Sequence, residues 1–155
     1  MSSQVELTDP VAHSVGGFKG HIARRTFHIS MAMLPWLYFT HGDTLSDYVN
    51  LDKPQIVSAG VIALILVETI RLKLGFTIYG QRDYEAKQVS ALAWGAFAVG
   101  ITFLCLPNSP EFVYPLIFSL SFGDPFLGEL RRVDFQPKMV FLSGTIFIMI
   151  LWIIT

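Results

Sequence analysis

The sequence predicts an all-α, polytopic integral membrane protein with about five transmembrane or partly spanning helices. Of its 155 residues, 52% are hydrophobic and only 15% are charged, whereas soluble domains carry roughly 25% charged residues. The apolar residues also form continuous blocks instead of recurring at a helical period, which is typical of helices surrounded by lipid. Several such blocks in so short a chain leave too little polar surface to cover a soluble globule.

Five apolar blocks define the predicted helices, at residues 26–40, 55–70, 88–106, 112–122 and 139–154. Only the third approaches the ~20 residues that cross a bilayer. We expect the fourth to stop partway, because Gly123 and Pro125 interrupt it where a charge appears. Residues 1–20 are polar and contain three glycines near their end, which predicts a flexible cytosolic tail before a single helical membrane domain at 21–155.

The basic residues predict the orientation. Of the 11 Lys and Arg residues, all except Lys53 precede the first block or lie in the loops after the second and fourth blocks. Loops rich in Lys and Arg remain cytoplasmic. The sequence therefore predicts a multi-pass protein whose amino terminus and long polar loops face the cytoplasm.

Charged residues at the cytoplasmic ends of the first two blocks are candidates for a site. In "ARRTFHIS", Arg24 and His28 are four residues apart and share a helix face, with Arg25 beside them. This pattern fits an interfacial anchor or a phosphate-binding face with a titratable imidazole. In "LVETIRLKLG", Glu68 and Arg71 fit a local ion pair. Glu68 follows a long apolar run, however, so its carboxylate needs a partner, a metal or a proton.

The third group, "YGQRDYEAKQVSALAW", places Arg82, Asp83 and Glu85 before the third block. Acidic residues in a first helical turn are explained by capping and by the helix dipole. A Mg²⁺–nucleotide site is the alternative, because it combines carboxylates for the metal with basic groups for the phosphates.

The fourth group is "SLSFGDPFLGELRR". Gly123-Asp124-Pro125 fits a helix end with an Asp turn. It equally fits a site, since Asp124 follows an apolar run and non-helical backbone at that depth needs protein or a water-filled cavity around it. Gly128 would allow a ligand to approach the backbone, and Arg131 and Arg132 supply cations one turn later.

Together the stretches "RRTFHI", "ETIR", "RDYE" and "GDPFLG" resemble, in that order, the motifs of the CTP-dependent membrane lipid kinases. This is the dolichol kinase, phytol kinase and yeast-type diacylglycerol kinase group, which is related to the phosphatidate cytidylyltransferases. The resemblance spans about residues 22–132. It implies a helical membrane enzyme that transfers the terminal phosphoryl group of CTP to a long-chain isoprenoid or similar lipid alcohol.

The resemblance also implies roles for individual residues. Mg²⁺ would be the cofactor, with Asp124 and Glu85 as its ligands, and CTP the phosphoryl donor. Catalytic residues would be Asp124, Glu68 and Glu85. The residues expected to bind the nucleotide and its phosphates are Arg24, Arg25, His28, Arg71, Arg82, Gly123, Gly128, Arg131 and Arg132.

Two other functions fit the same residues. A cytidylyltransferase-like enzyme would share the Gly-Asp and basic pair, and a catalytically inactive membrane subunit would share the helices. Family members carry a Glu-Gly-Ser/Thr element after the Gly-Asp helix, whereas this chain has Ser143-Gly144-Thr145 without the Glu. Expected partners are a lipid alcohol, a nucleoside triphosphate and the bilayer, with no nucleic-acid polymer. The small residues of "SALAWGAFAVG" would permit close helix contacts within one chain or in a homo-oligomer.

Overall fold

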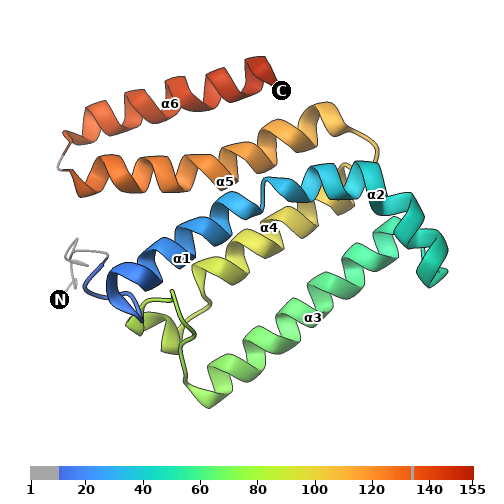
Figure 1. Cartoon of the computed structure of the whole chain (residues 1–155), viewed down its shortest axis with the longest axis horizontal. Helices are drawn as coiled ribbons and strands as arrows, with labels where there is room; N and C mark the ends of the chain where they lie inside the picture. Colours follow the sequence, from blue (N-terminus) through green and yellow to red (C-terminus); the bar gives the residue numbers. More distant parts are fainter. Residues whose placement is uncertain (1–10, 134) are drawn as a thin grey trace.

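The structure, a computed structural model, describes residues 11–133 and 135–155 and confirms the all-helical class. Six α-helices and one short 3₁₀ helix, η1, lie in this part of the chain (Figure 1). The elements are α1 (Gly17–Ser30), α2 (Met33–Val49), α3 (Lys53–Leu74), η1 (Asp83–Lys87), α4 (Ala91–Cys105), α5 (Pro110–Arg132) and α6 (Pro137–Ile154).

The helices form an elongated bundle with two chemically different ends. α1 and α2 run in nearly the same direction, and α3, α4, α5 and α6 then alternate in direction (Figure 1). The start of α1, the end of α3, η1, the start of α4, the end of α5 and the start of α6 therefore share one end, which we call the charged end. Every Lys and Arg except Lys53 belongs to these segments or, for Arg82, to the loop directly before η1. Lys53 lies at the opposite end, 2.8 Å from an oxygen of Asp43.

The first apolar block is divided between α1 and α2, which corrects the single helix predicted for it. Pro35 has no N–H to donate to the carbonyl of Met31. The backbone tightens there, and the N–H of Leu34 donates to Met31 O at 3.0 Å instead. Met31 and Ala32 keep helical dihedral angles, so the chain continues into α2 without a sharp turn.

The fourth block does not stop at Gly123 and Pro125, as we had expected. α5 is one helix of 23 residues that includes both Pro115 and Pro125, and Figure 1 shows it as a continuous ribbon. A proline inside a helix removes one hydrogen bond and crowds the carbonyl four residues earlier. For Pro125 this is the carbonyl of Ser121. Neighbouring helices on both sides of α5 hold it together across this defect.

Among the helices of residues 11–133 and 135–155, two are long and apolar enough to cross a membrane, α3 with 22 residues and α6 with 18. The third block, which looked longest in the sequence, forms a helix of only 15 residues, α4. Its first three residues, 88–90, form an extended link between η1 and α4 instead. On α3 the side chains of Ile62, Leu66 and Val67 are each more than half exposed.

Small residues allow the helices to approach one another closely. An added side chain at Gly100 of α4 would overlap Val61 of α3, and one at Gly144 of α6 would overlap Leu127 of α5. Gly144, the centre of the predicted Ser-Gly-Thr element, thus serves helix packing. The buried core between α2, α4 and α5 contains Met31, Tyr38, Val99, Phe103, Val113 and Ile117.

The end of the predicted tail is part of the fold. The N–H of Val15 donates to Gln81 O at 2.8 Å, and the N–H of Asp83 donates to His13 O at 3.1 Å. Gly80, with φ +88°, turns the loop so that it lies against α1, a conformation that favours glycine. The prediction of a flexible tail is therefore wrong for residues 13–20, and residues 1–10 lie outside the described part of the chain.

Candidate functional site

Arg71 uses all its hydrogen-bond donors inside the protein. Its guanidinium donates to both oxygens of Glu68 at 2.9 and 2.8 Å. It also donates to the carbonyls of Phe76, Glu85 and Gln88, at 2.9, 2.8 and 2.8 Å. An Arg side chain has five N–H donors, so none remains for a phosphate. Arg71 is 4% exposed and fastens the loop after α3 to that helix, which corrects its predicted role in phosphate binding.

Glu68 and Glu85 both stabilise the start of α4. The N–H of Ser90 donates to Glu68 at 2.7 Å, and the N–H of Ala91 donates to Glu85 at 3.0 Å. The hydroxyl of Ser90 accepts from the N–H of Ala93 at 3.1 Å. Amides at the start of a helix have no partner within the helix. Glu85 therefore caps α4, as one of the two explanations from the sequence expected, although Glu85 itself lies in η1.

Glu85 also forms a bidentate ion pair with Arg24. The Arg24 guanidinium lies 3.1–3.3 Å from the two carboxylate oxygens, and the N–H of Arg82 donates to the same carboxylate at 3.0 Å. Burial raises the pKa of Glu85, but the hydrogen bonds from Arg24, Ala91 and Arg82 outweigh burial and hold that pKa below its usual range.

Four predicted site residues thus belong to one internally satisfied set, which we call the saturated network: Arg24, Glu68, Arg71 and Glu85. Both oxygens of Glu85 and one oxygen of Glu68 accept at least two hydrogen bonds each, and the other oxygen of Glu68 accepts one from Arg71. Glu85 could bind a metal only by giving up Arg24. In this conformation Glu85 is a structural residue, and so is Glu68.

His28 and Asp124 are arranged differently. His28 is buried, with 5% exposure, and within the described residues neither of its ring nitrogens has a hydrogen-bond partner. Its Nδ1 lies 3.9 Å from Oδ2 of Asp124, whose side chain is 66% exposed. We call these two residues the open pair. Its carboxylate can be reached from solvent, unlike those of the saturated network.

Arg25 lies next to the open pair and connects α1 to α5. It forms an ion pair with Glu129 and donates to the carbonyl of Pro125 at 3.3 Å. Its Nε donates to Nε2 of His21 at 2.8 Å. Arg25 thus holds the Asp-Pro segment of α5 against α1.

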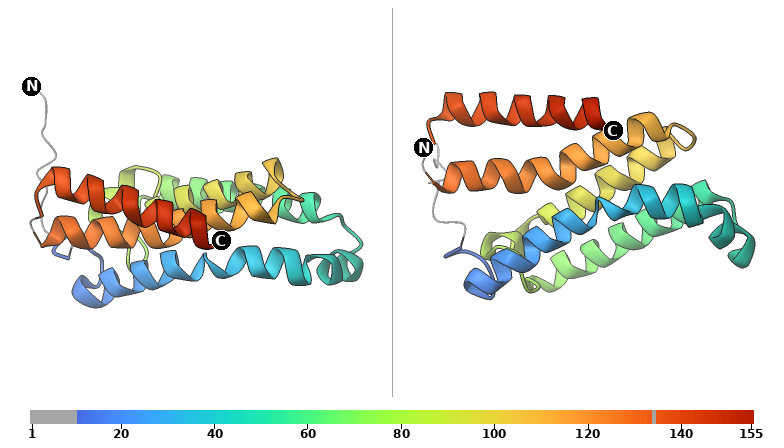
Figure 2. Two further views of the ribbon diagram at one scale, coloured as in Figure 1. Left: turned by 90° about the horizontal axis from the view of Figure 1, so that it is seen from above. Right: turned by 45° about the horizontal axis from the view of Figure 1, so that its top comes forward.

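Three of the predicted arginines, Arg25, Arg82 and Arg132, lie around His21. Burial lowers the pKa of His21, and the nearby charges of Arg25, Arg82 and Arg132 lower it further, while Glu129 raises it. These arginines come from α1, from the loop before η1 and from the end of α5, segments that meet at the charged end (Figure 2). Arg25 and Arg132 share one carboxylate, that of Glu129, so three arginines beside a single acidic side chain make this surface a candidate site for phosphate.

Other predicted residues have simpler environments. Arg131 is exposed at the end of α5. An added Cβ at Gly128 would lie 3.4 Å from a guanidinium nitrogen of Arg25, and one at Gly123 would meet no atom of another segment within 4 Å. Both glycines are helical, so neither is required by its backbone conformation.

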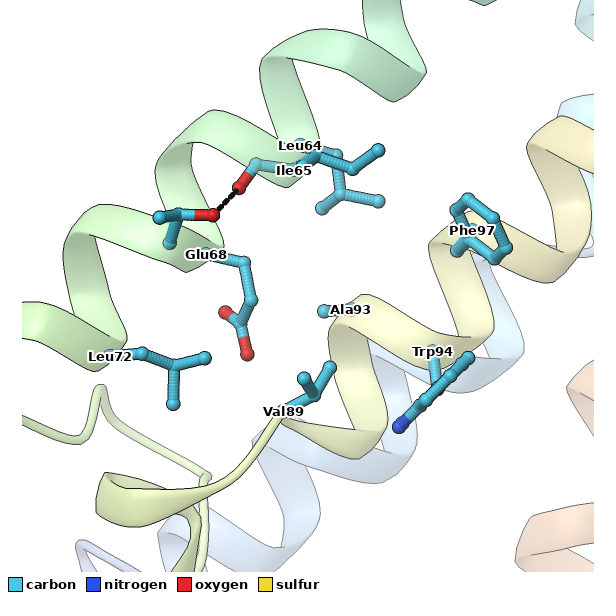
Figure 3. Close-up of a pocket in the computed structure, with 9 residues that line it drawn as sticks. Leu64, Ile65, Glu68, Leu72, Val89, Ala93, Trp94 and Phe97 are labelled. Carbon is cyan, nitrogen blue, oxygen red and sulfur yellow. Dashed lines mark hydrogen bonds between the residues drawn. The ribbon is translucent and has the colours of Figure 1, made fainter.

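An apolar groove of about 240 Å³ lies between α3 and α4. Figure 3 shows Glu68 projecting from α3 toward Val89 and Ala93 on the facing side. The groove is lined by Leu64, Ile65, Glu68, Thr69, Leu72, Val89, Ala93, Trp94 and Phe97. It therefore combines an apolar surface with a carboxylate that already belongs to the saturated network.

Two residues of the charged end were missed by sequence reasoning, His21 and Glu129. The spacing of His21 and Arg25 is the same i, i+4 spacing that singled out Arg24 and His28. That spacing is visible in the sequence, although His21 lies just before the stretch ARRTFHIS and before the first apolar block. Glu129 and Arg132 have the same i, i+3 spacing as Glu68 and Arg71 and form an ion pair at 2.7 Å, whereas the second partner of Glu129, Arg25, is distant in the sequence.

Comparison of the chain with protein-family models, with curated proteins and with solved structures finds no match.

Proposed function

We propose that this protein is a membrane enzyme that phosphorylates a long-chain lipid alcohol, with CTP as the phosphoryl donor. The observation that carries the proposal is the open pair, a solvent-accessible Asp124 beside a buried, unpartnered His28, next to the arginines around His21. A carboxylate for a metal beside cations for phosphates is the composition of a phosphoryl-transfer site. The ordered resemblance to the CTP-dependent lipid kinases supports the choice of reaction.

The exposed apolar surface supports a membrane location. α3 would be about 33 Å long at 1.5 Å per residue, enough for a hydrocarbon core of about 30 Å, and only 6% of its most apolar window is buried. Such a surface is unfavourable in water and suits lipid. In the proposal the bundle crosses the membrane several times with its charged end in the cytoplasm, as the distribution of Lys and Arg indicates.

In the proposal, different residues of the charged end bind the metal ion and the phosphates. Asp124 would hold Mg²⁺, which offsets phosphate charge when bound. Arg25, Arg82 and Arg132 would bind the triphosphate, and Arg131 is exposed on the same end of α5. Phosphoryl transfer depends mainly on positioning and charge neutralisation, so no covalent nucleophile is required.

The groove between α3 and α4 would hold part of the lipid chain. Its volume of about 240 Å³ is below the range of sites that enclose a whole small molecule, which suits one segment of a flexible chain. It lies along α3, a helix whose apolar side chains face outward. A lipid could therefore enter it sideways from the bilayer.

The test uses purified full-length protein in detergent with Mg²⁺, lipid alcohols of several chain lengths, and CTP labelled at either the terminal or the α-phosphate. We expect terminal label on the lipid and none from the α-position. Transfer of the α-phosphate with release of pyrophosphate would identify a cytidylyltransferase instead. Absence of label on every lipid tested would overturn the proposal.

Asp124→Asn gives a sharper form of the same test. Because the Asp124 side chain is 66% exposed, the variant should change the free energy of unfolding by less than about 0.5 kcal/mol. Transfer should be lost. Near-normal turnover in the folded variant would mean that Asp124 is only a polar residue on the helix surface.

A second candidate is a membrane subunit of the same fold that binds a nucleotide without turnover. The saturated network favours it, because Glu68 and Glu85 are engaged structurally. A ligand that binds only the folded protein raises its stability. CTP that raises the Tm without any transfer would identify this subunit, whereas CTP without either effect would exclude both candidates.

A further inference from the structure

The environment of His28 remains unexplained by the contacts within the protein. The side chain lies in α1 against Gly95 of α4, with 5% exposure, and neither ring nitrogen has a partner among the described residues. Buried polar atoms nearly always have a hydrogen-bond partner or a ligand. A buried imidazole with two unused nitrogens therefore indicates a bound group.

The geometry of the open pair identifies the kind of group. Nδ1 of His28 and Oδ2 of Asp124 are 3.9 Å apart, which is too far for a hydrogen bond. Two ligands of one metal ion lie about 3–4 Å apart, because each bond to the metal is about 2.0–2.2 Å long. The pair therefore has the separation of two metal ligands.

The surrounding charges favour a cation at this place over a phosphate. Arg24 pairs with Glu85, and Arg25 pairs with Glu129, a carboxylate that it shares with Arg132. Among the described residues Asp124 forms no ion pair with an arginine. Its carboxylate is therefore available to a cation beside His28. A cation at this place would replace the expected contact of His28 with phosphate.

We propose that His28 and Asp124 together bind one divalent metal ion, and that the imidazole makes the site prefer Mn²⁺ or Zn²⁺ to Mg²⁺. Imidazole suits transition metals better than it suits Mg²⁺. The described residues contain no group of three or more His, Cys, Asp or Glu side chains placed to hold a metal. Water and, on the proposed function, phosphate oxygens of the nucleotide complete the coordination.

The test measures binding of Mn²⁺ alone to the full chain in detergent, by electron paramagnetic resonance. We expect one bound Mn²⁺, electron spin echo modulation from a ¹⁴N nucleus, and an affinity for Mn²⁺ at least about tenfold higher than that for Mg²⁺ in competition. Bound Mn²⁺ without ¹⁴N modulation, or an equal preference for Mg²⁺, would overturn the proposal.

Variants identify the nitrogen. His28→Gln should lose the ¹⁴N modulation and weaken Mn²⁺ binding by at least about tenfold, and His41→Ala, at the opposite end of the bundle, should change neither. Asp124→Asn should weaken binding in a protein that still folds, since this side chain is exposed. If His28→Gln binds Mn²⁺ with unchanged modulation, or if His21→Ala removes the modulation instead, the assignment to His28 is wrong.

The metal site and the kinase reaction fail separately. Mn²⁺ bound through His28 in a protein that phosphorylates no lipid would overturn the proposed function and leave the metal site. A His28→Gln variant that keeps both phosphoryl transfer and Mn²⁺ binding would overturn the metal site and leave the proposed function.

Discussion

The saturated network and the open pair both consist of ionisable residues at the charged end of the bundle, but the first has its hydrogen bonds satisfied within the protein and the second does not. Arg71 uses every donor it has, and both oxygens of Glu85 accept several hydrogen bonds. His28 has two unused nitrogens, and the carboxylate of Asp124 is open to solvent.

This difference separates scaffold from site. A charged group that is buried with all its partners can be removed only at a large cost, and it has no bond to offer a ligand. A group whose partners are missing is able to bind one. The four motifs of the resemblance therefore contribute unequally. ETIR and RDYE fold the loop before α4, GDPFLG supplies Asp124 of the open pair, and RRTFHI contributes to both through Arg24 and His28.

The largest expected effect comes from breaking the saturated network at its centre. Arg71→Met leaves Glu68 charged and three carbonyls without donors in a buried position. We expect the free energy of unfolding to fall by about 3–5 kcal/mol, measured by thermal unfolding in detergent. Lys73→Met, an exposed change on the same helix, is the control and should be nearly neutral. A comparable loss in both variants would mean that the network adds nothing specific.

A smaller effect is expected from Glu85, and it depends on pH. Since its pKa is held below the usual 4.5, its ionised form stabilises the fold above that pH, and this stability is lost as pH falls through the lower folded pKa. Glu85→Gln should cost about 2 kcal/mol at pH 7 and reduce the loss of Tm between pH 5 and pH 3. Parallel pH profiles for the two proteins would show that Glu85 does not carry this stability.

The groove gives a functional comparison within α3. Ile65→Trp would fill the groove, whereas Ile62→Trp on the same helix lies outside its lining and is similarly exposed. We expect the first variant to raise KM for long-chain alcohols by about tenfold, which corresponds to about 1.4 kcal/mol of lost binding, and the second to leave KM unchanged. Equal KM values would place the lipid elsewhere.

The smallest expected change tests the site end of α5. Gly128→Ala adds a methyl group at ordinary contact distance, 3.4 Å, from Arg25. Replacing a helical Gly by Ala should stabilise the protein by about 0.5–1 kcal/mol. If a phosphate binds close to Gly128, transfer should nevertheless fall, while Gly123→Ala, which meets no other segment, should remain active. Unchanged transfer in both variants would remove Gly128 from the site.

Much of the fold could be predicted from local composition. The helical class, the approximate position of each apolar block and the segregation of Lys and Arg were all correct. The Glu68–Arg71 ion pair was also predictable, because residues three apart on a helix are neighbours. The division of the first block was missed because Pro35 was not weighed, although its lost hydrogen bond is a local property.

The continuity of α5 could not be predicted in the same way. Gly123 and Pro125 weaken a helix locally, and packing against α1, α4 and α6 outweighs that weakness. Both prolines are visible in the sequence, but the helices that pack against α5 and stabilise it despite these prolines are not.

The sequence by itself determined the helices, the apolar surface and the charged end, because these follow from residue type and short-range spacing. Only the tertiary structure decided which charges are satisfied. Arg24 meets Glu85 across 61 positions, and Arg25 meets the carbonyl of Pro125 across 100. Whether a buried charge is scaffold or site depends on such distant partners, since hydrogen bonding is decided by position in space and not by order along the chain.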